Sequence, residues 1–174
     1  MFLFLERVMI MQVTMKSEPL STNGEPIKIG EQLPDFKVKR SDGSSASTTD
    51  LVNKVTLISV VPNINTSVCS ISTKRFNSEV DNFDGINFYT VSTNTPEEQK
   101  NWCAAEGVSK MELLSDESFD FGKKMGLFID GTKFDSRSIW IVDANKKVLY
   151  QELIHELTNE PNYAKALAFL QNLR

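Results

Sequence analysis

The sequence predicts an α/β fold in which a mixed central sheet carries helices on both faces. Two observations lead to this prediction: β-branched runs alternate with segments of helical periodicity, and an antiparallel strand pair followed by a last helix closes the pattern. The length of 174 residues, with 40% hydrophobic residues, suits one domain with its own core. The sequence has no internal repeat or long linker, so one continuous domain is expected.

Hairpins are predicted at the N-terminal end of this domain. Between Met11 and Gly30, short apolar and Thr-rich pieces are separated by the turn-forming residues 21–24, which predict a hairpin loop. Residues 36–39 alternate apolar and polar side chains and end at Ser-Asp-Gly in residues 41–43. A second hairpin is therefore expected there.

A buried strand and a helix are predicted next. Residues 55–61 form a β-branched run of the kind found in a sheet covered on both faces, and Pro62 ends it. The apolar residues that then recur at helical spacing are Phe76, Val80 and Phe83. They predict a helix that starts near Thr66 or Val68 and ends at about Asn82.

The second half of the chain continues the alternation. Residues 86–92 predict a strand, and Pro96 followed by two glutamates opens a helix that carries Trp102 and Cys103. Residues 138–142 and 147–150 flank a turn and predict an antiparallel pair. A last helix begins near Pro161. Its apolar face is expected to hold Tyr163, Leu167, Leu170 and Leu173.

Composition excludes several classes of function. Nineteen basic and 23 acidic side chains give a net charge of −4, so the chain has no broad attraction to nucleic acid. Two cysteines and one histidine form neither a disulfide framework nor a zinc site, so no metal is expected. Apolar stretches are too short to span a membrane. We expect a cytoplasmic protein.

The first residues are not expected to belong to the domain. Residues 1–5 are apolar, but Glu6 and Arg7 interrupt the run, and the layout of a signal peptide is absent. We expect residues 1–10 to be a non-native or disordered extension from a misassigned start codon, and residues 11–174 to form the single domain.

The most informative feature is the spacing of Pro62, Thr66 and Cys69, a PxxxTxxC pattern directly after the predicted buried strand. A thiol in the first turn of a helix faces unpaired backbone N–H groups and the positive end of the helix dipole, which favour thiolate over thiol. Without this spacing, Cys69 and Cys103 would be interpreted as inert core thiols. Thr66 also has a common structural use, as a helix N-cap.

The motif in its context, VVPNINTSVCSISTKRFN, resembles the peroxiredoxin family, and in particular its bacterial thiol peroxidase branch. That branch is of the atypical two-cysteine type and carries its second cysteine in a later helix, where Cys103 in NWCAAEG fits. The resemblance implies a thioredoxin-like three-layer fold with an N-terminal β-hairpin.

The resemblance also implies roles for the site residues. Cys69 would attack a peroxide and become a sulfenic acid, and Cys103 would resolve it as an intramolecular disulfide. Thr66 would orient peroxide and thiolate through its hydroxyl, Pro62 would shield the sulfur, and Arg137 would come from a distant strand to hold the negative charge. Two cysteines on separate helices lie too far apart to bond, so local unwinding is expected, with Trp102 reporting it.

The same resemblance implies the partners. The expected substrates are hydrogen peroxide and organic hydroperoxides, and the polar residues 93–99 leave open which class is preferred. A thioredoxin-like protein is the implied reductant, because neither a flavin site nor a GxGxxG pattern is present and no cofactor is called for. A homodimer is expected.

Two other functions start from the same residues. A peroxide sensor or redox relay would form the same sulfenic acid and pass oxidation to a partner protein. A dithiol exchange protein or chaperone on the same scaffold is disfavoured by the missing CxxC motif.

Overall fold

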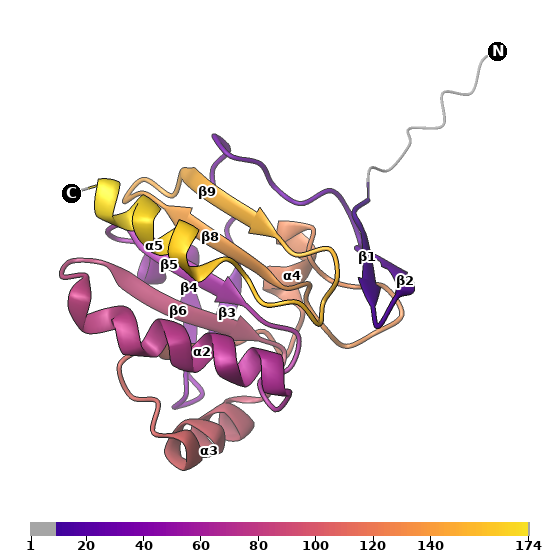
Figure 1. Ribbon diagram of the computed structural model, residues 1–174, viewed down its shortest axis with the longest axis horizontal. Helices are drawn as coiled ribbons and strands as arrows, with labels where there is room; N and C mark the ends of the chain where they lie inside the picture. Colours follow the sequence, from indigo (N-terminus) through magenta and orange to yellow (C-terminus); the bar gives the residue numbers. More distant parts are fainter. Residues whose placement is uncertain (1–9, 174) are drawn as a thin grey trace.

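The computed structural model describes residues 10–173, arranged around a central sheet (Figure 1). The strands are β1 (Gln12–Met15), β2 (Glu18–Ser21), β3 (Lys37–Lys39), β4 (Ser45–Ser47), β5 (Thr56–Val60), β6 (Asn87–Ser92), β7 (Glu112–Ser115), β8 (Ser138–Val142) and β9 (Val148–Leu153). The helices are α1 (Thr48–Leu51), α2 (Ser67–Glu79) with the 3-10 turn η1 (Val80–Asn82), α3 (Pro96–Glu106), α4 (Asp120–Met125) and α5 (Tyr163–Asn172).

The central sheet is mixed, as predicted. Its strand order is β4-β3-β7-β6-β5-β8-β9, while β1 and β2 form a separate two-stranded hairpin. The middle strands β5, β6 and β7 are parallel, and β8 pairs antiparallel with β5. All five residues of β5 are buried, as the β-branched run predicts for a central strand covered on both faces.

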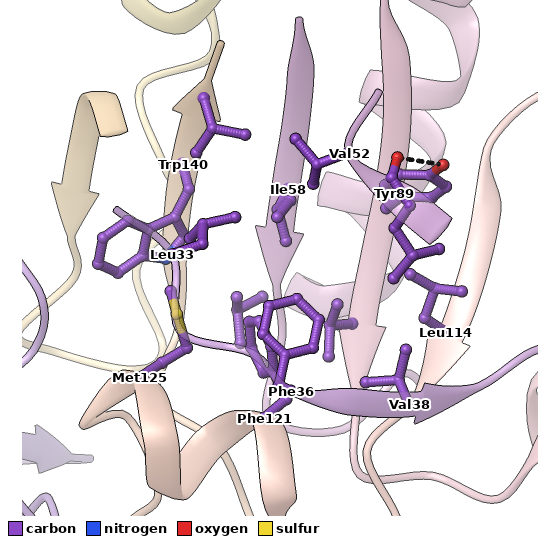
Figure 2. Close-up of a cluster of buried hydrophobic side chains, with 14 of the residues drawn as sticks. Leu33, Phe36, Val38, Val52, Ile58, Tyr89, Leu114, Phe121, Met125 and Trp140 are labelled. Carbon is purple, nitrogen blue, oxygen red and sulfur yellow. Dashed lines mark hydrogen bonds between the residues drawn. The ribbon is translucent and has the colours of Figure 1, made fainter. Parts of the chain in front are cut away.

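Alternate residues of the strands pack into two different cores. On one face, Ile58 and Trp140 pack with Phe121 and Met125 of α4 (Figure 2). Next to them, the Tyr89 hydroxyl donates to the Leu51 carbonyl at 3.0 Å. The period of two along a strand sends the neighbouring residues to the opposite face.

The opposite face is covered by longer helices. Leu57 and Ile141 of the sheet pack there with Phe76 of α2, Trp102 of α3 and Leu170 of α5. Figure 1 shows α2 and α5 on the same side of the sheet. Helices on both faces of a mixed sheet confirm the predicted fold class.

The N-terminal hairpin exists, but its turn is not where the sequence predicts it. Lys16 and Ser17 form the turn, with φ angles of 50° and 69°, whereas Ser21 ends the second strand and residues 22–24 lie beyond it. In that segment the buried Thr22 hydroxyl accepts the Met11 N–H at 2.9 Å and donates to the Gly24 carbonyl at 2.7 Å. Polar residues that resemble a turn signal therefore hold a tertiary contact instead.

The other predicted elements are confirmed, and three are missing from the prediction. The second hairpin, the strands at β5, β6, β8 and β9, and the helices α2, α3 and α5 all form near their expected bounds. The short elements α1, β7 and α4 were not predicted. Leu173 was wrongly assigned to the apolar face of the last helix: α5 ends at Asn172, and Leu173 is 41% exposed.

Two predictions about chain organisation stay predictions. Residues 1–9 lie outside the described residues, so the expectation that residues 1–10 are an extension stays a prediction. Ile10, the first described residue, is exposed. The single domain over residues 11–174 likewise remains our expectation.

Two glycines with similar backbones allow a matched test of the α4 packing. Gly126 ends α4 at φ +72°, and a Cβ there would lie 2.3 Å from the Glu25 carbonyl oxygen. Gly131 has φ +76° with nothing within 4 Å. We expect Gly131→Ala to cost about 1 kcal/mol, for the left-handed backbone alone. Gly126→Ala should cost about 3 kcal/mol or more, because the clash is with backbone atoms. Equal losses in urea unfolding would contradict this packing.

Candidate active site

The loop between β5 and α2 brings the motif residues to one end of the sheet. Pro62 is buried just after β5, and Thr66 is the N-cap residue of α2 with an extended backbone. The Thr66 hydroxyl donates to the Asn63 carbonyl at 2.9 Å and makes no side-chain capping bond to the helix. The capping role considered for Thr66 is therefore not seen, and its hydroxyl oxygen can still accept.

Cys69 lies in the first turn of α2, as predicted. The Ser70 N–H bonds back to the Thr66 carbonyl at 2.9 Å, so the N–H groups of the three residues before Ser70 lie at the free N-terminal end of the helix. The Cys69 side chain is fully buried in the core beneath α2. A sulfur in this position combines an apolar environment with the positive end of a helix dipole.

Arg137 reaches this sulfur because of strand register. Val60 of β5 pairs with Ser138 of β8, so the end of β5 that leads into the motif lies beside the residue preceding β8. The Arg137 Nη2 donates to Cys69 Sγ at 3.2 Å, and its Nε donates to the Leu157 carbonyl at 3.0 Å. The side chain is only 3% exposed, so a full positive charge is buried next to the thiol.

A pocket of ≈ 370 Å³ opens beside these residues. Pro62, Thr66 and Arg137 line it, together with Met15, Lys16, Asn63, Ser67, Val68, Phe134, Leu157 and Thr158. Cys69 itself is not a lining residue, and Arg137 connects the pocket to the sulfur. The structure thus brings Pro62, Thr66, Cys69 and Arg137 together.

The polar residues 93–99 do not line this pocket. Asn94 instead fixes the motif loop: its Oδ1 accepts the Ile64 N–H at 2.9 Å, and its Nδ2 donates to Asn63 Oδ1 at 3.1 Å and to Glu98 at 2.9 Å. The polarity of this segment therefore serves structure. Apolar side chains that sequence reasoning did not assign to the site, Met15, Phe134 and Leu157, form the wall instead.

Cys103 is not part of this cluster. It lies on α3, half-buried, and lines a different pocket of ≈ 330 Å³ with Gln99, Lys110 and Met111. Burial raises the pKa of the Cys103 thiol. Both cysteines are free, although both contact the same core.

Sequence reasoning also missed a buried carboxyl pair, Asp116 and Asp135, next to α4. Asp116 accepts the N–H groups of Phe121 and Gly122, each at 2.9 Å, at the start of α4. Asp135 lies against Gly122, where a Cβ would come within 1.8 Å of its Oδ1. Burial raises the pKa of both carboxyls, and the neighbouring Asp116 raises that of Asp135 further. Because Asp116 receives the backbone donors, we assign the shared proton to Asp135.

Fold and site together define a thioredoxin-like protein with a buried thiol in the first turn of a helix, hydrogen-bonded by an arginine. The AhpC/TSA family model matches residues 29–151. The thiol peroxidase of Bacillus subtilis (strain 168) is 40% identical over 157 residues, covering 90% of this chain and 94% of that protein. The thiol peroxidase of Oceanobacillus iheyensis is 41% identical over 159 residues, covering 91% and 97%.

Solved structures share the fold. A peroxiredoxin-like protein from Aquifex aeolicus superposes with a TM-score of 0.88 at 28% identity, covering 95% of this chain and 99% of that one. A thiol peroxidase from Chromobacterium violaceum shares the fold with a TM-score of 0.84 at 19% identity, covering 92% and 96%. The chain belongs to the AhpC/TSA family of peroxiredoxins, on its thiol peroxidase branch.

Within residues 10–173, no helix has both the length and the apolar character needed to cross a bilayer. The same residues contain no group of three or more His, Cys, Asp or Glu side chains arranged to hold a metal ion.

The carboxyl pair predicts a pH-dependent stability. Asp135 has a pKa raised in the folded state, so its contribution to stability is present at low pH and is lost as the pH rises through that folded value. Asp135→Asn stays neutral and can donate to Asp116 at any pH. We expect the difference in Tm between Asp135→Asn and wild type to become more positive from about pH 5 to about pH 8.

Asp130→Asn is the matched control, because Asp130 is exposed in the same segment and should leave the pH profile unchanged. A Tm difference for Asp135→Asn that stays constant or falls with pH would contradict the shared proton.

Proposed function

We propose that this protein, a thiol-dependent peroxidase by its family, reduces hydrogen peroxide and organic hydroperoxides through a sulfenic acid on Cys69. The observation that carries the proposal is the hydrogen bond from Arg137 Nη2 to Cys69 Sγ at 3.2 Å, next to the N-terminal end of α2. The buried guanidinium of Arg137 and the N-terminal end of α2 both stabilise negative charge on the Cys69 sulfur.

In the first step the Cys69 thiolate attacks the terminal oxygen of the peroxide. An S–O bond forms and the O–O bond breaks, so the sulfur loses two electrons, and the leaving alkoxide or hydroxide takes up a proton to become alcohol or water. Arg137 Nη1 is buried and has no hydrogen-bond partner among the described residues. This donor and the Thr66 hydroxyl are suited to hold the two peroxide oxygens.

In the second step the Cys103 thiol attacks the sulfenic sulfur. The S–S bond forms, the S–O bond breaks, and the departing hydroxide takes the Cys103 proton and leaves as water. Because Cys69 is fully buried and Cys103 lines another pocket, we propose that the first turn of α2 and the region of Cys103 unwind locally. A thioredoxin-like dithiol then supplies two electrons and two protons to restore both thiols.

The setting of this cycle is also part of the proposal. Two free cysteines fit a reducing compartment such as the cytoplasm.

Ile71, on α2 two residues after Cys69, is 51% exposed, and an exposed apolar side chain at this place fits a homodimer contact near the site. Sedimentation that stays strictly monomeric at micromolar concentration would remove the dimer.

Intact mass with thiol counting tests the cycle directly. After one equivalent of hydrogen peroxide, we expect the reduced protein to lose two hydrogens and both thiols, with a peptide map showing a Cys69–Cys103 disulfide and a change in Trp102 fluorescence. Cys103→Ser should gain one oxygen on Cys69, and Cys69→Ser should not react. One turnover without recycling by thioredoxin would favour the sensor or relay function instead.

Arg137 can be tested through the rate of the first step. Arg137→Gln removes a charged hydrogen bond worth about 1.5–3 kcal/mol, so we expect Cys69 oxidation to slow about 10- to 100-fold. Arg137→Lys should recover only part of the rate, because it restores the charge without the planar fork. Arg40→Gln, in a surface pair with Glu112, is the control. Wild-type rates in folded Arg137→Gln would contradict its role.

A further inference from the structure

The N-terminal hairpin forms one wall of the active-site pocket without belonging to the central sheet. Met15 and Lys16 line the pocket, yet β1 and β2 pair only with each other as strands. The hairpin is attached through a small core of Met11, Val13, Ile129 and Leu157, against which Met15 and Phe134 pack. Figure 1 shows it at one side of the sheet, near the loop that leads to α5.

The turn of this hairpin is strained. Lys16 and Ser17 have φ angles of 50° and 69°, a conformation that side-chain-bearing residues adopt at a cost. Neither is the glycine or asparagine that such a turn normally uses. The turn therefore depends on contacts from outside the hairpin to keep its shape.

Glu156 supplies these contacts. Its Oε1 accepts the Lys16 N–H at 2.8 Å and the Thr158 hydroxyl at 2.7 Å, and its Oε2 accepts the Ser17 N–H at 3.3 Å and the Thr14 hydroxyl. The hydroxyls of Thr14 and Thr158 lower its pKa to about 2, with smaller contributions from the two backbone donors. One ionised carboxylate thus holds both turn residues and the first strand.

The same segment touches the reactive centre. The Leu157 N–H donates to the Thr14 carbonyl at 2.8 Å, and the Leu157 carbonyl accepts from Arg137. Backbone bonds hold this connection, whereas the turn itself is held by the Glu156 side chain. Glu156 is therefore placed to control the pocket wall more than the position of Arg137.

We propose that Glu156 is a positioning residue that sets the preference for organic hydroperoxides, by holding Met15 and Lys16 in the pocket wall. This inference rests on the proposed peroxidase function. The alkyl group of an organic hydroperoxide would contact the wall formed by Met15, Phe134 and Leu157. Hydrogen peroxide has no such group, so it gains less from an ordered wall.

Glu156→Gln is the test. An amide nitrogen replaces one carboxylate oxygen and opposes the donors there, so the turn loses part of its support. We expect the ratio of kcat/KM for cumene hydroperoxide to kcat/KM for hydrogen peroxide to fall about tenfold, mainly through a higher KM for the organic substrate. Hydrogen exchange at the Lys16 and Ser17 amides should become faster.

Two further variants make the test specific. Glu18→Gln removes the same charge from an exposed position of the same hairpin and should leave the ratio and the exchange at wild-type values. Thr14→Val removes one donor to Glu156 and should move both readouts in the same direction as Glu156→Gln, which covers the case in which that variant does not fold.

The outcomes distinguish a failure of the Glu156 role from a failure of the proposed peroxidase function. Faster amide exchange with an unchanged substrate ratio would overturn the positioning role, and so would an equal loss for both peroxides. If the wild-type protein reduced neither peroxide, the proposed function would fail, whereas the amide exchange would still show whether Glu156 holds the turn.

Discussion

The candidate active site depends on a buried positive charge, the guanidinium of Arg137. A guanidinium keeps its charge at any ordinary pH, and burying it without partners would be strongly unfavourable. Arg137 is 3% exposed, and its interior partners include the Leu157 carbonyl and the Cys69 sulfur. Because the carbonyl carries only a partial charge, the sulfur is the partner that can become an anion. The buried charge therefore lies beside the sulfur on which the proposed cycle needs negative charge.

Three distant parts of the chain must fold together to form this contact. The pairing of β5 with β8 places Arg137, the start of α2 supplies Cys69, and the segment after β9 provides the carbonyl at Leu157. That last segment also anchors the N-terminal hairpin through Thr14. The pocket wall and the Arg137–Cys69 contact therefore both depend on this segment, the wall through the Glu156 side chain and Arg137 through the Leu157 carbonyl.

The sequence predicted those parts of the fold and of the site that depend on local signals. The β-branched run ended by Pro62, the glutamates after Pro96 and the spacing of Thr66 and Cys69 all lie within a few residues of the features they specify. Arg137 lies 68 residues from Cys69, and only the family resemblance pointed to it. The hairpin turn was misplaced because neither Lys16 nor Ser17 is the glycine or asparagine that favours a positive φ, and both depend on Glu156. Helix α4 was missed because its start is held by Asp116, outside the helix.

Burial also orders the two steps of the proposed cycle. Burial raises the pKa of Cys103, so in the folded enzyme this group is held as a thiol, which is the poorer nucleophile. The Asn94 bridge between the motif loop and Glu98 would resist the local unwinding that we propose. We infer that Cys103 becomes reactive only when α3 loosens, and that the folded reduced state keeps the thiols apart until a peroxide has reacted at Cys69.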